Sequence, residues 1–134
     1  MDRILVPTSP GELIDKLTIL RIKTEEIADP AKLANVNSER EALQAEADRH
    51  LPPSNELSAL WQQLYEINCT LWQVEDDIRA CDAAGEFGET FVKLAQLVYV
   101  TNDRRAEVKK KINLLLGSDL VEEKSYEDYG KDPA

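Results

Sequence analysis

The chain has few aromatic side chains, few glycines and only one histidine. Aromatic residues make up 6% of its 134 residues, so aliphatic side chains have to form most of the core. The one histidine, His50, leaves too little material for a histidine-ligated zinc site or a histidine-based catalytic triad. The five glycines are scattered and form no phosphate-binding loop. These absences exclude several common classes of enzyme.

Basic residues are also scarce, with 16 Lys and Arg against 26 Asp and Glu and a net charge of −10. Nucleic-acid binding depends on neutralising phosphates, and anionic membrane surfaces attract basic segments. We therefore expect neither a nucleic-acid partner nor a membrane partner. Basic residues do gather between positions 104 and 111, just ahead of an acidic C-terminal tail at 117–134.

Long hydrophobic runs are absent as well, and no run approaches the ~20 residues of a membrane-spanning helix. The apolar residues 4–6 are too few for the core of a signal peptide. Cys69 and Cys81 are expected about 18 Å apart on one helix, beyond the ~7 Å between Cα atoms that a disulfide spans. Two reduced cysteines and no export signal predict a cytoplasmic protein.

Capping residues, prolines and glycines predict four helices in a single domain covering residues 1–134. Ser9 and Glu12 flank Pro10 in a capping-box pattern, which marks the start of the first helix. Pro30, the pair Pro52-Pro53 and glycines mark the later ends, with Gly117 at the position just past the last helix. The predicted helices cover about residues 10–28, 31–50, 55–83 and 89–116.

The third and fourth helices carry the clearest pattern, a heptad spacing typical of coiled coils. In the third helix the repeating positions are Leu57, Leu60, Leu64, Ile67, Leu71, Val74, Ile78 and Cys81. In the fourth they are Phe91, Leu94, Val98, Thr101, Arg105, Val108, Ile112 and Leu115. We expect a long antiparallel hairpin covered by a shorter hairpin of the first two helices, which gives an all-α, four-helix arrangement.

Polar residues interrupt this apolar seam between Thr101 and Arg105. A buried arginine costs several kcal/mol unless it is paired and hydrogen-bonded, and Glu66 or Asn68 is the expected partner of Arg105. Two interpretations remain open: a buried pair that sets the helix register, or an anion-binding site inside the helices.

Two further polar groups have a simpler interpretation. Glu75 and Arg79 are spaced to form an ion pair on one helix face, although Glu75 and Asp76 could also ligate magnesium. Glu12 and Lys16 share a stripe on the first helix. Because charge runs on helices are usually solvated, we favour surface roles for both groups and expect no metal and no cofactor.

Four motifs resemble a family of short bacterial and phage proteins classed as a domain of unknown function. They are P-T-S-P-G-E-L-I-D-K-L-T-I-L at 7–20, L-W-x-V-E-D-D-I-R at 71–79, N-D-R-R at 102–105 and E-E-K-S-Y at 122–126. The resemblance covers about residues 4–129 and implies a cell-surface polysaccharide context, but it supplies no catalytic residues. It includes Asp15, Asp103 and Arg104 among the polar residues of the pattern.

We favour a helical binding or assembly module over an enzyme. Its partner would be another protein or a second copy, meeting either Trp61, Tyr65 and Trp72 or the basic end of the fourth helix. The acidic tail is expected to fold back on that basic end. The alternative is a small all-α enzyme or ligand binder that holds an anionic metabolite in a polar pocket between helices. The candidate residues are Lys16, Glu75, Asp76, Arg79, Asn102, Arg105 and Lys109.

Overall fold

The computed structural model describes residues 1–128, and within that range it contains α-helices and no strands. This confirms the predicted all-α fold with four helices. The predicted tail residues 129–134 lie outside the described residues. The helices are α1 (Pro10–Glu26), α2 (Pro30–His50), α3 (Asn55–Ala83) and α4 (Glu89–Leu115).

Side chains cap the first three helices. Ser9, Asp29 and Ser54 accept hydrogen bonds from the amides of Glu12 (3.2 Å), Lys32 (3.2 Å) and Leu57 (3.0 Å). The first helix ends at Glu26, two residues before the predicted limit, because Ile27 is already extended and Asp29 must be extended to cap α2 ahead of Pro30.

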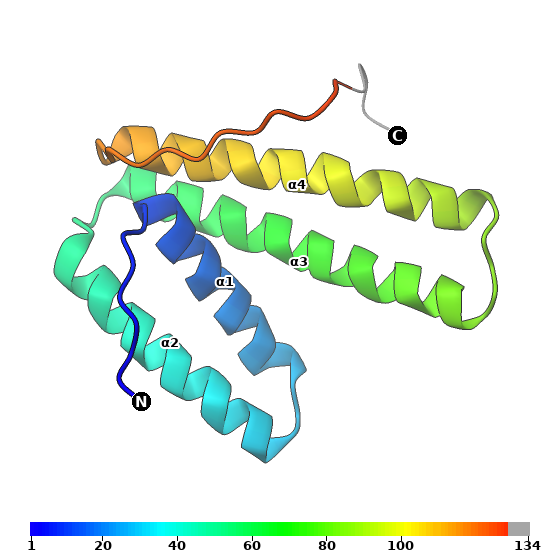
Figure 1. Cartoon of the computed structure of the whole chain (residues 1–134), viewed down its shortest axis with the longest axis horizontal. Helices are drawn as coiled ribbons and strands as arrows, with labels where there is room; N and C mark the ends of the chain where they lie inside the picture. Colours follow the sequence, from blue (N-terminus) through cyan, green and yellow to red (C-terminus); the bar gives the residue numbers. More distant parts are fainter. Residues whose placement is uncertain (129–134) are drawn as a thin grey trace.

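The last helix ends as the sequence predicts. Gly117 has a φ of +66°, a left-handed conformation that glycine adopts without a steric penalty. The amide of Ser118 then donates to the carbonyl of Asn113 at 2.9 Å, which is the bonding of a Schellman cap. This turn reverses the chain and sends the tail back along α4 (Figure 1).

The helices form two hairpins of unequal length (Figure 1). The long hairpin pairs α3 with α4, and α1 lies across one end of it in contact with both helices. The backbone of α2 packs on α1 and on no other described helix. Arg40 of α2 donates to the hydroxyl of Thr24 of α1 at 3.3 Å, which adds a polar contact between the two helices of the short hairpin. The arrangement is therefore an attached pair of hairpins rather than a closed bundle.

The core lies where α1 meets the long hairpin. Ile14, Leu64 and Ile112 come from three different helices and are completely buried. A second cluster joins Leu13 and Leu17 of α1 to Ala47 of α2. The hydrophobic effect at this junction is the main force that holds the short hairpin in place.

The aromatic face suggested as a partner site is largely used inside the molecule. Trp61 packs against both core clusters. The hydroxyl of Tyr65 donates to Glu25 at 2.6 Å, and the guanidinium of Arg21 lies 3.7 Å from the centre of its ring. The hydrogen bond that Tyr65 donates to Glu25 raises the pKa of Tyr65 above its ordinary value. These contacts hold α1 against α3 and leave Trp61 and Tyr65 engaged.

The far half of the long hairpin extends beyond α1 and α2, and we call residues 74–100 the arm (Figure 1). At its root, Val74 and Val100 are buried. Further out, Ile78, Leu94 and the other seam residues are only half-buried. The seam is thus well covered at the base of the hairpin and partly open along the arm.

The described residues also bear on the expectations for the two cysteines and for membrane-spanning helices. Cys69 and Cys81 are both free, as their spacing predicts. None of the described helices combines the length and the apolarity that crossing a membrane requires.

Candidate functional site

The first turn of α1 lies directly on α4. The amide of Gly11 donates to the side-chain oxygen of Asn113 at 2.8 Å, in a buried contact. A Cβ atom at Gly11 would lie 2.5 Å from the carbonyl oxygen of Lys109, so only glycine permits this approach without a shift. The crossing brings the acidic first turns of α1 next to the basic residues of α4.

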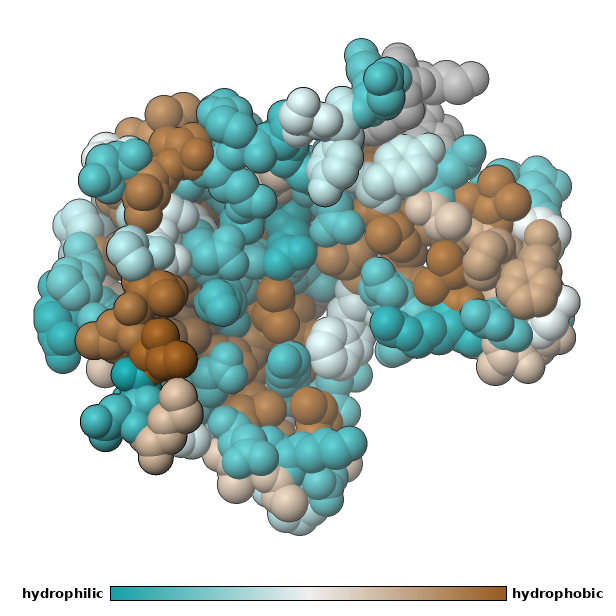
Figure 2. Space-filling view, in the orientation of Figure 1, coloured by the Kyte–Doolittle hydropathy of each residue, from teal (hydrophilic) through white to brown (hydrophobic). Residues whose placement is uncertain are grey.

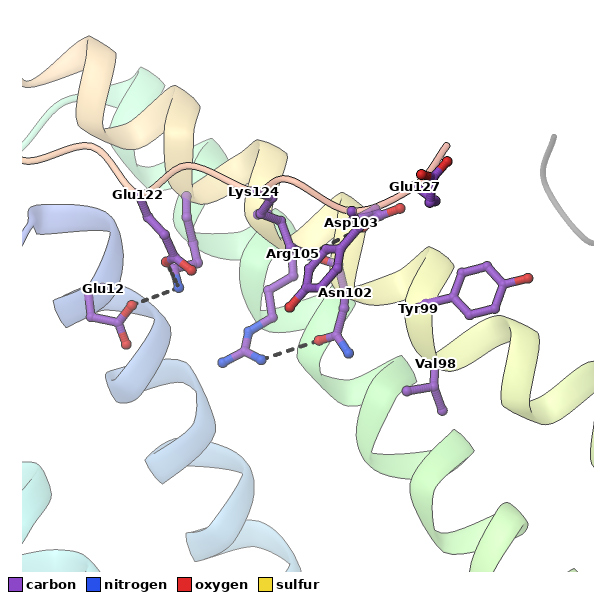
Figure 3. A pocket seen from close by; sticks show the side chains of 12 residues that line it. Glu12, Val98, Tyr99, Asn102, Asp103, Arg105, Glu122, Lys124 and Glu127 are labelled. Carbon is purple, nitrogen blue, oxygen red and sulfur yellow. Dashed lines mark hydrogen bonds and ion pairs between the residues drawn. The ribbon is translucent and has the colours of Figure 1, made fainter. Parts of the chain in front are cut away.

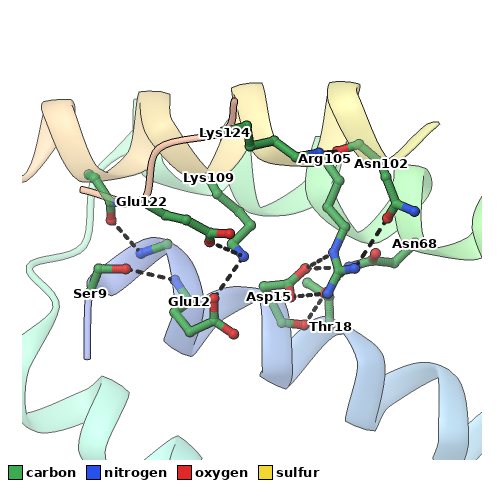
Figure 4. A network of polar contacts seen from close by, with 12 residues as sticks. Ser9, Glu12, Asp15, Thr18, Asn68, Asn102, Arg105, Lys109, Glu122 and Lys124 are labelled. Carbon is green, nitrogen blue, oxygen red and sulfur yellow. Dashed lines mark hydrogen bonds and ion pairs between the residues drawn. The ribbon is translucent and has the colours of Figure 1, made fainter. Parts of the chain in front are cut away.

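An ion pair between Asp15 and Arg105 forms the centre of the polar region (Figure 4). The Asp15 side chain is 1% exposed, and Arg105 donates to its two oxygens from Nε at 2.8 Å and from Nη2 at 2.5 Å. The hydrogen bonds to Asp15 raise the pKa of Arg105 although burial opposes the rise. Bidentate pairing of this kind is strong and geometrically specific.

The prediction that Glu66 or Asn68 pairs with Arg105 was wrong. Neither Glu66 nor Asn68 is hydrogen-bonded to it; the carboxylate comes from Asp15, 90 positions earlier in the chain. Register within the long hairpin suggested a partner on α3. The carboxylate of α1 is the nearer one because α1 crosses α4 in the same layer.

Further polar side chains complete the network. Asn68 donates to Asp15 at 2.9 Å and to the hydroxyl of Thr18 at 2.8 Å. Arg105 also donates to Asn102 at 3.4 Å. We call Asp15, Thr18, Asn68, Asn102 and Arg105 the clamp, because together they join α1, α3 and α4. Of the two interpretations of the seam arginine, the geometry supports the buried pair.

Lys109 makes a second link between α1 and α4. Its amine lies 2.7 Å from Glu12 and 3.2 Å from Glu122 of the tail, with the lysine side chain 13% exposed. Burial lowers the pKa of Lys109, but the hydrogen bonds to Glu12 and Glu122 and the nearby Asp15 outweigh it, and the net pKa is raised. Glu12 points to Lys109 and not back to the helix start, so the capping box is only half formed.

The tail is held against α4 by further ion pairs. Lys110 lies 3.5 Å from Glu123, and Lys124 lies 3.2 Å from Asp103. These contacts confirm the expectation that the acidic tail folds back on the basic end of α4. They engage Lys109 and Lys110 of the basic surface that was one of the two expected partner sites, whereas Arg104 and Lys111 of that surface are exposed.

A pocket of about 740 Å³ opens between α4, the first turn of α1 and the tail (Figure 3). It brings together three predicted site residues, Asn102, Arg105 and Lys109. Its walls also carry two aromatic rings, four carboxylates and a further lysine. The lining residues are Glu12, Val98, Tyr99, Asn102, Asp103, Arg105, Ala106, Lys109, Glu122, Lys124, Tyr126 and Glu127.

A smaller pocket of about 280 Å³ lies where the arm begins. It contains the other predicted charged residues except Lys16, which is exposed and lines neither pocket. Glu75 and Arg79 form the expected ion pair, at 3.6 Å on the surface. The lining residues are Ile19, Ile22, Asn68, Leu71, Trp72, Glu75, Asp76, Arg79 and Arg105.

Arg105 therefore lies between two pockets, with its guanidinium held by Asp15 from one side. No group of three or more His, Cys, Asp or Glu side chains in residues 1–128 is placed to hold a metal ion. The site offers hydrogen bonding and fixed charge.

Asp15 was the main residue missing from the predicted site. It lies between Ile14 and Leu17 on the buried face of α1, where a carboxylate needs a buried cation. Arg105 interrupts the seam of α4 in the same way. Two complementary charges on apolar faces were the signal that could have identified the pair.

Comparison with known proteins identifies the family without adding a function. A family model described as a family of unknown function, DUF6165, matches residues 4–134. No curated protein and no solved structure matches the chain significantly. The chain therefore belongs to the family DUF6165.

Proposed function

We propose that this protein is a helical binding module whose ligand site is the pocket between α4, the first turn of α1 and the tail. The observation that carries the proposal is the convergence of Asn102, Arg105 and Lys109 on a pocket of about 740 Å³. That volume lies within the ~300–1,000 Å³ typical of small-molecule sites.

The charges of the pocket favour a neutral ligand over the anionic metabolite first considered. Each cation in the wall already has a carboxylate partner: Arg105 with Asp15, Lys109 with Glu12, and Lys124 with Asp103. An anion would have to compete with these carboxylates within a molecule of net charge −10. A neutral molecule rich in hydroxyl groups can instead donate to the carboxylate oxygens without disturbing the pairs.

The remaining walls suit a ligand with flat apolar faces. Tyr99 and Tyr126 are 43% and 81% exposed, and Val98 and Ala106 complete the apolar part of the lining. Hydroxyl donors combined with C–H faces are the chemistry of a saccharide unit. A saccharide ligand also agrees with the cell-surface polysaccharide context that the sequence resemblance implies.

Binding fits the site better than catalysis. A general base needs a carboxylate free to accept a proton from the substrate, and a nucleophile needs an adjacent base. In the clamp, the oxygens of Asp15 are occupied by Arg105 and Asn68, which supports a structural role for that carboxylate. The predicted cytoplasmic location and the absence of an enzyme activity stay predictions.

A thermal-shift and calorimetry panel tests the proposal. The probes are neutral mono- to trisaccharides, the corresponding uronic-acid saccharides and inorganic phosphate, each added to the full chain. A neutral saccharide at 100 times its Kd should stabilise the protein by ~2.7 kcal/mol and raise the unfolding midpoint by several degrees. Binding of phosphate or uronic acids alone would contradict the neutral-ligand proposal, and no shift with any saccharide would contradict the saccharide assignment.

A matched pair of variants locates the binding. Tyr126→Ala removes an exposed ring from the pocket, whereas Phe87→Ala removes an exposed ring from the tip of the arm. We expect the first to weaken saccharide binding about tenfold, equivalent to about 1.4 kcal/mol, and the second to leave it unchanged. Equal effects of the two substitutions would place the ligand elsewhere.

A further inference from the structure

The arm exposes an apolar seam that the base of the same hairpin keeps covered. At the base, Leu64 and Ile112 are fully buried under α1. Beyond the root of the arm, no described helix lies over α3 and α4 (Figure 1). Phe87 and Val92 are 57% and 49% exposed there, and the seam residues Ile78 and Leu94 are half-buried. Hydrophobic and charged residues both lie on the visible face of the arm (Figure 2).

The smaller pocket continues this surface at the root of the arm. Ile19 and Ile22 of α1 face Leu71 and Trp72 of α3 across a space of about 280 Å³. Figure 2 shows the open angle between the arm and the short hairpin. We call this pocket, together with the half-buried seam residues Ile78, Phe91 and Leu94 of the arm, the arm groove.

The charges along the arm indicate what fits the groove. Residues 74–100 contain six acids and two bases, so the arm carries a charge of six minus two, or −4. Both bases are already paired, Arg79 with Glu75 and Lys93 with Glu89. The acids are Glu75, Asp76, Asp77, Asp82, Glu86 and Glu89.

This charge disfavours a second copy as the occupant. Pairing two arms would place −4 beside −4 along the whole contact, and like charges at an interface are repulsive. A partner with basic residues beside an apolar stripe has the complementary charge. The part of α3 in the arm, residues 74–83, is about 15 Å long, which matches three turns of a docked helix.

We propose that the arm binds a basic amphipathic helix of a partner protein, with its apolar stripe along the open seam and its first turns beside Trp72. The helix would present apolar anchors at i, i+3 or i+4 and i+7, as in other helix-in-groove complexes. The two sites are distinct, because the arm groove shares only Arg105 with the tail pocket, although Val98 and Tyr99 at the base of the arm line the tail pocket.

The test uses a labelled synthetic peptide of leucine and lysine with helical amphipathic spacing, titrated into the full chain and followed by fluorescence anisotropy. A peptide of the same composition in scrambled order and a leucine–glutamate peptide are the controls. We expect the lysine peptide to bind and both controls to bind at least tenfold more weakly. Equal binding of the scrambled peptide would show simple charge attraction and overturn the proposal.

Matched charge reversals locate the contact. Asp76→Lys with Asp82→Lys changes two exposed acids of the arm, and Glu39→Lys with Glu41→Lys makes the same net change on α2. The arm variant should weaken peptide binding about tenfold more than the α2 variant, while both keep wild-type saccharide binding. Equal weakening by the two variants would overturn the docking site.

Sedimentation of the free chain completes the test. We expect a monomer at tens of micromolar and at both low and high salt. A dimer that dissociates in the Asp76→Lys, Asp82→Lys variant would mean that a second copy occupies the arm, which contradicts the proposal. Changes in amide NMR shifts on peptide binding should fall on α3 and α4 within residues 71–97; changes confined to residues that line the tail pocket would also contradict the proposal.

Discussion

At the scale of single residues, burial and pairing decide what each charged side chain does. Asp15 is accommodated in the core because Arg105 and Asn68 donate to its oxygens at hydrogen-bond distance. The cost of removing two charges from water is offset only when such donors are in place. Arg105 is therefore a structural residue first, and its place in the pocket wall follows from that role.

Replacing Arg105 alone should be strongly destabilising. Arg105→Met leaves the Asp15 carboxylate buried without its cation, and we expect a loss of about 3 kcal/mol in the free energy of unfolding. That value is at the low end for buried pairs because the Arg105 side chain is 26% exposed. Urea denaturation of Arg105→Met, of Asp15→Leu and of the double variant measures the losses in unfolding free energy. The double variant should lose less than the sum of the two single ones; strict additivity would disprove the pairing.

Gly11 offers a test in which two effects have opposite signs. Alanine has the higher helix propensity and by itself would stabilise α1 by up to ~1 kcal/mol. A Cβ atom 2.5 Å from the Lys109 carbonyl oxygen instead forces α1 away from α4, and overpacking costs about 1–3 kcal/mol. We expect Gly11→Ala to lower the thermal midpoint. A higher midpoint would show that the two helices do not touch there.

Replacing Thr101 should stabilise the protein, in contrast to replacing Gly11. Its side-chain oxygen is buried, and within residues 1–128 it has no hydrogen-bond partner. Thr101→Val keeps the shape and removes an unsatisfied polar group, which costs ~1–3 kcal/mol when left unpaired. We expect chemical denaturation to show a gain of about 1 kcal/mol. A loss of similar size would mean that the hydroxyl has a partner after all.

At the scale of elements, the tail acts as a strap on α4. Within residues 1–128, ion pairs of Lys109, Lys110 and Lys124 hold it. Two of these lysines are partly exposed: Lys110, which pairs with Glu123, and Lys124, which pairs with Asp103. Exposed pairs contribute about 0–1 kcal/mol each and weaken with salt. The strap is therefore a weakly held wall of the pocket.

Truncating the chain after Gly117 should remove this salt-sensitive contribution. The truncated protein should stay folded, because tail residues 118–128 supply none of the buried core residues. Its unfolding free energy should change less between low and high salt than that of the full chain. Glu122→Gln with Glu123→Gln in the full chain should have the same effect. Identical salt dependence of all three proteins would rule out the strap.

Local patterns in the sequence predict the elements well. Capping residues such as Ser9 and Ser54 act within one helix turn, and the seam of α3 and α4 repeats at fixed spacing, so both are visible without tertiary information. The crossing of α1 over α4 is different in kind. It joins Asp15 to Arg105 across 90 positions and depends on the close approach at Gly11, which no periodic pattern encodes. The pocket was missed in part for the same reason, since its walls come from three separate segments.

At the scale of the whole molecule, one seam runs through two environments. At the base it is covered by α1 and fixed by the clamp, and there the pocket forms. Along the arm the residues of the same seam, such as Ile78 and Leu94, are only half-buried. The base and the arm of α3 and α4 should therefore differ in local stability although they belong to the same two helices.

Amide hydrogen exchange along α3 and α4 tests this division most directly. Local opening requires less free energy where fewer apolar contacts are broken, so amides of the arm should exchange well before those near Leu64 and Ile112. The experiment is run on the full chain at two protein concentrations, to detect any cover supplied by a second copy. We predict slow exchange at the base and faster exchange in the arm at both concentrations. Uniform protection along the two helices would contradict the account.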